Sequence, residues 1–277
     1  MQIVNDHGPS LFEIRAVVQE LAGDDPAAAL KALGALRCLV DHNGNTAVCA
    51  AFLVPSLIRM AANRGFACRV EVLQLVGDLA RTDGLRVEMR PWMLRAAQPI
   101  PVYAPWGYFE NWSVDAVRVM VGRDARLLID LLDDDDPGVR GRAAYVLVTA
   151  LPVIEDLTGV LRSKLDLEGN AAVRMILIIG LAQHHRELDR VPEALAWTQA
   201  LWSDPALPVE FRLGGAIAWL NLTSAAIPPG LRCLRDAVPL PVVRELAQHL
   251  PWIWWLSRYP PDGIEAWWRR LDLASSD

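Results

Sequence analysis

The clearest pattern of hydrophobic and polar positions lies in the middle of the chain, at residues 127–147. Its first part predicts a helix with one buried stripe, because apolar side chains recur there at helical spacing: Leu127, Leu128, Leu131 and Leu132. Four aspartates then end this helix. Asp136 is a good N-cap for a second helix, and Pro137 suits its first position, where the backbone needs no N–H donor. The inner face of that helix would carry Val139, Ala143, Ala144 and Leu147.

The second helix supplies a register that can be followed along the chain. Arg140 stands one turn into it, and small or apolar residues follow three, four and seven positions later. Similar arginines occur at Arg69, Arg174, Arg212 and Arg244. The intervals from Arg140 to Arg174, on to Arg212 and on to Arg244 are 34, 38 and 32 residues. Arg69 lies 71 residues before Arg140, which is two periods. Periods of this length predict stacked helical hairpins.

Paired helices are predicted in most of the remaining chain. The expected ranges are 11–22, 47–63, 66–81, 85–97, 152–165, 170–184, 191–203, 229–238, 240–250 and 262–273. The turns Asp24-Asp25-Pro26 and Asp204-Pro205 precede two more helices, and Ser113 is expected to cap a short one. The pattern is interrupted at residues 98–112, where three prolines and five aromatic residues cannot continue a helix.

The order of leucine helix, Asp-Pro turn, Val-Arg, Ala-Ala and Leu at residues 127–147 resembles the HEAT repeat. The resemblance covers nearly the whole chain. It implies one all-α domain, residues 1–277, built as a right-handed α-solenoid of about six to seven HEAT-like helical hairpins. It also implies that turn aspartates and repeat arginines join adjacent repeats, which gives a structural ladder of Asp136, Arg69, Arg140, Arg174 and Arg212. The alternative is that the arginines form a series that binds anions.

Two aromatic segments are candidates for a site. The insert at residues 98–112 presents Tyr103, Trp106, Tyr108, Phe109, Glu110 and Trp112. Aromatic rings near a carboxylate could hold a peptide, a cation or an aromatic ligand, and the alternative is a structural plug. A Trp-rich segment at 251–277 is expected to cap the open end of the solenoid, or else to contact a partner or a second copy. Its tryptophans are Trp252, Trp254, Trp255, Trp267 and Trp268.

Composition narrows the class of protein. Hydrophobic residues make up 53% and charged residues 22% of the chain, which excludes disorder as its main state. The net charge of −6 disfavours nucleic acid, because a protein that neutralises many phosphates is normally basic. The four cysteines lie far apart without a CxxC motif, so they are expected to be reduced thiols in the core. The start of the chain lacks the features of a signal peptide, and residues 213–231 form a poor membrane span. These features predict a cytoplasmic protein without a membrane segment.

No motif in the sequence supports catalysis, a metal or a cofactor. The chain contains no Gly-rich phosphate loop, GxSxG elbow or HExxH motif. The acidic turn lacks the alternating ligands of an EF-hand, and the adjacent His184 and His185 would point about 100° apart on a helix. The favoured hypothesis is therefore a non-catalytic scaffold or regulatory module whose concave face binds a protein or peptide. The alternative is a HEAT-type enzyme or small-molecule binder, such as a DNA glycosylase-like protein, with its pocket at the aromatic insert. The oligomeric state stays open.

Overall fold

The structure is a computed structural model that describes residues 11–42, 45–81, 92–97, 110–258 and 263–270. Apart from one pair of two-residue strands, β1 (Asp41–His42) and β2 (Asn45–Thr46), its regular elements are all helices. The described α-helices are α1 (Leu11–Leu21), α2 (Pro26–Val40), α3 (Ala50–Ala62), α4 (Arg69–Leu79), α5 (Glu110–Arg123), α6 (Ala125–Asp130), α7 (Pro137–Leu147), α8 (Leu157–Leu167), α9 (Ala171–Glu187), α10 (Val191–Ser203), α11 (Val209–Leu222), α12 (Pro229–Ala237), α13 (Leu240–Ala247) and α14 (Gly263–Arg270). Two 3-10 segments, η2 (Leu131–Asp133) and η3 (Pro251–Arg258), follow α6 and α13. The predicted all-α class is confirmed.

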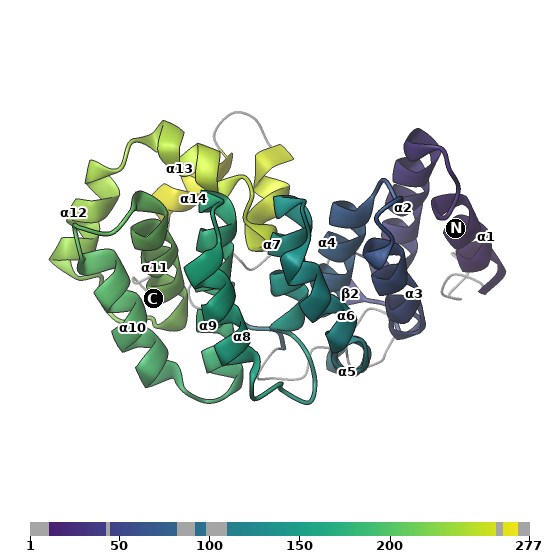
Figure 1. Cartoon of the computed structure of the whole chain (residues 1–277), viewed down its shortest axis with the longest axis horizontal. Helices are drawn as coiled ribbons and strands as arrows, with labels where there is room; N and C mark the ends of the chain where they lie inside the picture. Colours follow the sequence, from purple (N-terminus) through teal and green to yellow (C-terminus); the bar gives the residue numbers. More distant parts are fainter. Residues whose placement is uncertain (1–10, 43–44, 82–91, 98–109, 259–262, 271–277) are drawn as a thin grey trace, which may run out of the picture.

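Helices that are close in sequence lie side by side along the longest axis of the molecule (Figure 1). The helices of four hairpins contact each other: α1 with α2, α3 with α4, α8 with α9 and α10 with α11. The second helices also form a continuous row, in which α2, α4, α7, α9 and α11 touch in turn. This arrangement is compatible with a helical repeat.

The turns that begin the row helices follow the predicted chemistry. The Asp136 carboxylate accepts a hydrogen bond from the backbone N–H of Gly138 at 2.7 Å, and Asp25 does the same for Ala27 at 3.0 Å. Asn170 caps α9 by accepting from the N–H of Val173. Each cap satisfies a donor that the first turn of a helix leaves without a partner. The helix starts at Pro26, Pro137 and Ala171 are therefore determined locally.

Several helix bounds differ from the prediction. Ser113 does not cap a helix: α5 already begins at Glu110, and Ser113 is buried inside it. The helix expected from residue 152 begins only at Leu157, because residues 148–156 form a turn whose Leu151 N–H donates to the carbonyl of Arg118 in α5. Of the range 85–97, only residues 92–97 are described, and they form turns rather than a helix.

The row helices are buried along most of their length. In α9 and α11, nearly every residue after the first turn is shielded from solvent. Neighbouring row helices approach closely at glycines, as at Gly77 in α4, where an added Cβ would lie 2.3 Å from Cε1 of Tyr145 in α7. Such small residues allow large side chains of the next helix to pack without a gap.

The C-terminal segment returns to the middle of the molecule. In Figure 1, α13 and α14 lie near the upper end of α9, and η3, which joins them, contacts α7. Trp252 of η3 is buried; its indole N–H donates to Gln183 of α9 at 2.8 Å, and its ring meets Tyr145 of α7 edge to face. Gln74 of α4 donates to the carbonyl of Pro251. The η3 part of this segment thus packs on the face of the row helices, where it finds buried polar and aromatic partners. The cap predicted over residues 251–277 as a whole stays a prediction.

Candidate functional site

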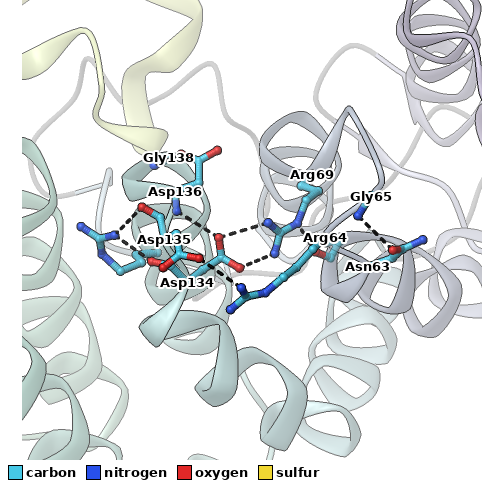
Figure 2. Close-up of polar contacts among 10 residues, drawn as sticks. Asn63, Arg64, Gly65, Arg69, Asp134, Asp135, Asp136 and Gly138 are labelled. Atoms are coloured by element: carbon cyan, nitrogen blue, oxygen red, sulfur yellow. Dashed lines mark hydrogen bonds and ion pairs between the residues drawn. The ribbon is translucent and has the colours of Figure 1, made fainter.

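Arg69 joins α4 to the turn that precedes α7. Its guanidinium donates to both oxygens of Asp134, at 3.1 and 2.5 Å, and its Nε donates to the carbonyl of Ala61. Figure 2 shows Arg69 and Asp134 facing each other, with the more exposed pair of Arg64 and Asp135 beside them. The hydrogen bond from Arg69 lowers the pKa of Asp134, although burial opposes the shift.

Arg140 and Arg174 make the corresponding contacts further along the row. Arg140 in α7 donates from Nε and Nη2 to the Glu168 carboxylate just before α9, at 2.8 and 2.7 Å. Arg174 in α9 donates from Nη1 to Glu210, in the first turn of α11, at 3.0 Å. Burial acts to raise the pKa of Glu168, but hydrogen bonds from Arg140 and from the backbone N–H of Asn170 leave it lowered.

The remaining members of the predicted ladder have different surroundings. Asp136 caps α7, and it is Asp134, two residues earlier, that accepts from Arg69. Arg212 in α11 has no hydrogen bond or ion pair among the described residues, and its Nε is buried without a partner. Three of the four arginines therefore bridge successive row helices. The acceptor lies two residues before the helix cap, as Asp134 and Glu168 do, or in the first turn of the helix, as Glu210 does.

The aromatic insert lies mostly outside the described residues. Tyr103, Trp106, Tyr108 and Phe109 belong to the part that the structure does not describe. Glu110 is the first residue of α5, and Trp112 lies in the first turn of that helix with 67% of its surface exposed. The prediction of a site at 98–112 is untested.

A cleft of about 390 Å³ lies on the face of the row where the C-terminal segment returns. Its walls come from α2, α4, α7 and η3, and the side chains that carry its chemistry are Arg37, Glu71, Gln74, Arg142 and Trp254, with Gly34 beside them. Pockets that bind ligands in proteins commonly have volumes of about 300–1,000 Å³ and combine apolar walls with a few polar groups. The sequence pattern does not predict this cleft, because its walls are far apart in the chain.

One wall of the cleft is held in place by the Asp78 carboxylate of α4. Asp78 accepts from Nε2 of Gln74 at 2.8 Å, from the hydroxyl of Tyr145 at 3.0 Å and from the indole N–H of Trp254 at 3.2 Å. It also pairs with Arg37 of α2 at 2.9 Å. The Arg37 guanidinium in turn lies 4.9 Å from the centre of the Trp254 ring. Donors from α2, α4, α7 and η3 thus meet at Asp78, and they fix Trp254 at the edge of the cleft.

The Arg142 side chain lines the same cleft without a partner. No hydrogen bond or ion pair of Arg142 occurs among the described residues, and its Nε is buried and unsatisfied. Burial lowers the pKa of Arg142, and nearby acids, of which Glu71 has the largest effect, only partly oppose this. A guanidinium withdrawn from water in this way favours the approach of an anion.

A second cavity, of about 260 Å³, adjoins the Arg140–Glu168 pair. Its charged side chains are already paired: Nζ of Lys164 lies 2.5 Å from Oδ1 of Asp133, and the Glu168 carboxylate pairs with Arg140. This cavity therefore offers an incoming ligand fewer available charges than the cleft does.

The described residues contain no group of three or more His, Cys, Asp or Glu side chains that could hold a metal ion. Burial is the main cause that lowers the pKa of His184, to about 4, so this imidazole is neutral near pH 7. All four cysteines are free thiols, but the prediction that they lie in the core is correct only in part, because Cys38 and Cys233 are exposed. None of the described helices is both long enough and apolar enough to cross a bilayer.

The chain is thus an all-helical protein whose helices pack against their sequence neighbours. No protein-family model matches it, and no curated protein matches its sequence. Among solved structures it is similar to the crystal structure of an engineered protein, with 12% sequence identity and a TM-score of 0.37. The match covers 95% of this chain and 98% of that chain.

Proposed function

We propose that this protein is a non-catalytic binding module of the HEAT-like type, a right-handed solenoid of about six to seven hairpins that holds a protein or peptide partner in the cytoplasm. The arginines Arg69, Arg140 and Arg174 are structural in this proposal, because each is already bonded to an acid of the next hairpin. They join the repeats and leave the face of the row rigid.

The observation that carries the proposal is the cleft between α2, α4, α7 and η3. Its walls are fixed before any ligand arrives, since Asp78 receives donors from α2, α4, α7 and η3. A fixed site loses little conformational entropy on binding. Trp254 and Arg142 supply the aromatic and cationic groups that are enriched where binding energy is concentrated.

Two glycines allow a sharp test of the site. Gly34 lines the cleft, and an added Cβ there would meet nothing within 4 Å, so Gly34→Trp fills the cleft without a clash at its Cβ. Gly159 in α8 is equally open and lies outside the cleft, so Gly159→Trp is the matched control.

Peptides selected from a random displayed library against the purified full chain should bind the wild type and Gly159→Trp equally. Gly34→Trp should lose most of this binding while keeping the circular dichroism spectrum and melting temperature of the control. Equal binding by both tryptophan variants would refute the assignment of the cleft.

The hypothesis of an enzyme or small-molecule binder at residues 98–112 depends on side chains outside the described part. It stays a prediction. Trp112→Ala, compared with Gly34→Trp in the same binding assay, distinguishes the two locations.

A further inference from the structure

We infer that the cleft recognises a carboxylate on an acidic peptide, and that Arg142 is the residue that receives it. This inference rests on the proposed binding function and specifies its ligand. The first step is the way the chain treats its buried arginines. Arg81 donates to the carbonyls of Gly77 and Tyr145, at 2.6 and 2.8 Å. Arg118 donates to the carbonyl of Thr149 and pairs with Glu187.

Arg142 departs from this rule within a cavity. Burying a guanidinium without a partner costs free energy, and folded proteins normally pair such groups. The Nε atoms of Arg81, Arg95, Arg186 and Arg212 are also buried and make no hydrogen bond among the described residues, but none of these arginines lines either of the two cavities described above. Among the arginines that the structure describes, Arg142 alone combines an unsatisfied Nε with a place in the wall of the cleft. Its Nη1 and Nη2 groups have no hydrogen bond or ion pair among the described residues either, and they can donate to an external acceptor.

The charges around the cleft favour a single negative charge on the ligand. Arg37 faces the cleft too, but it is already paired with Asp78 at 2.9 Å and with Asp41 at 3.5 Å. Glu71 adds a negative charge to the wall. A dianionic phosphate would be repelled by Glu71 more strongly than a carboxylate would, while one guanidinium can hold a carboxylate through two parallel hydrogen bonds.

Gln74 favours a ligand that also carries a hydrogen-bond donor. Its Nε2 is used by Asp78 and by the carbonyl of Pro251, but its Oε1 is buried without any donor. A peptide that carries a Glu or Asp side chain offers the carboxylate for Arg142, and it can donate a backbone N–H to Gln74 once the amide group turns its Oε1 toward the cleft. The indole of Trp254 forms part of the remaining wall.

The test uses synthetic peptide libraries on an array, with a fixed central Glu, Gln or phosphoserine and random flanking residues. The full-length wild type should bind the Glu library at least about tenfold more tightly than the Gln library, and more tightly than the phosphoserine library. Arg142→Gln should abolish the preference for Glu over Gln, and Arg212→Gln, the matched control, should keep it.

A stability measurement separates recognition from a structural role. Because the charge of Arg142 is unpaired in the free protein, Arg142→Gln should leave the melting temperature unchanged or raise it. A lowered melting temperature would make Arg142 structural and would overturn the inference.

The other outcomes separate the inference from the proposed function. If the Glu and Gln libraries bind equally and Gly34→Trp abolishes both, the cleft binds peptides but does not read a carboxylate. Stronger binding of the phosphoserine library would mean that the cleft recognises a phosphate and not a carboxylate, and would overturn the inference. If no library binds the wild type, both the inference and the proposed function are wrong.

Discussion

Replacing Arg140 by alanine removes the guanidinium that joins α7 to the entry of α9. It donates to Glu168 at 2.8 and 2.7 Å, and to the carbonyls of Asp134 and Asp135 at 2.8 and 3.1 Å. The side chain of Glu168 is 6% exposed and that of Arg140 19%, so water would replace these contacts poorly. Removing one partner of a buried ion pair costs about 3–5 kcal/mol, and the partial exposure of Arg140 reduces this, so we expect a loss of about 2–4 kcal/mol.

The assay is equilibrium unfolding in urea, followed by far-UV circular dichroism, because uncharged urea leaves the ion pair unscreened. A loss of this size should lower the melting temperature by about 5–10 °C. Arg212→Ala is the matched control, since Arg212 occupies the same register in α11 without a hydrogen bond or ion pair among the described residues. It should change the free energy of unfolding by less than about 1 kcal/mol.

The pH dependence provides an independent check. The folded-state pKa of Glu168 lies below its ordinary value of 4.5, so its contribution to stability is present above pH 4.5. That contribution is lost as the pH falls through the folded-state pKa. The difference in free energy of unfolding between wild type and Arg140→Ala should therefore have its full size at neutral pH and disappear in acid. Equal losses for Arg140→Ala and Arg212→Ala, or a difference that does not depend on pH, would refute the reasoning.

Three further predictions concern packing and titration. Gly77→Ala should lower the free energy of unfolding by about 1–3 kcal/mol, because its Cβ would lie 2.3 Å from Cε1 of Tyr145. Gly159→Ala, the control, should raise the free energy of unfolding by up to about 1 kcal/mol. Equal melting temperatures of the two variants would contradict this prediction. Trp252→Ala should cost about 3–5 kcal/mol in urea unfolding, since this ring is 3% exposed, and a loss below about 1 kcal/mol would show that the returning segment contributes little. Between pH 6.5 and about 4 the unfolded chain binds a proton at His184 that the folded chain excludes, so the free energy of unfolding falls by up to about 3 kcal/mol as the pH drops. His184→Leu should make this fall shallower in urea unfolding measured at several pH values. An unchanged slope would contradict the assignment.

The helices and many of their starts could be predicted from the sequence because they depend on neighbouring residues. Asp25 and Asp136 stand directly before Pro26 and Pro137, and each carboxylate caps its helix by accepting from the backbone N–H two residues later. The spacing of Arg69, Arg140 and Arg174 likewise follows the row helices. Local hydrogen bonds and the helical period are sufficient for these features.

The partners of those arginines depended on the tertiary structure. The sequence offers four adjacent aspartates, and only the packing of α4 against α7 places Asp134 opposite Arg69. Ser113 is a case in which the local pattern was misleading. Serine is typical of a helix cap, but α5 begins earlier, at Glu110, and Ser113 is buried inside the helix.

The cleft was also decided by tertiary structure alone. Arg140 and Arg142 are two residues apart, so they project about 200° apart around α7, one toward the hairpin turns and the other toward the returning C-terminal segment. The hydrogen bond from Gln74 to the carbonyl of Pro251 spans 177 residues, and no local pattern encodes such a contact. The sequence by itself determined a row of helices with bonded turns. Which face was covered, and which described arginine of the cleft was left without a partner, followed from contacts between segments distant in the chain.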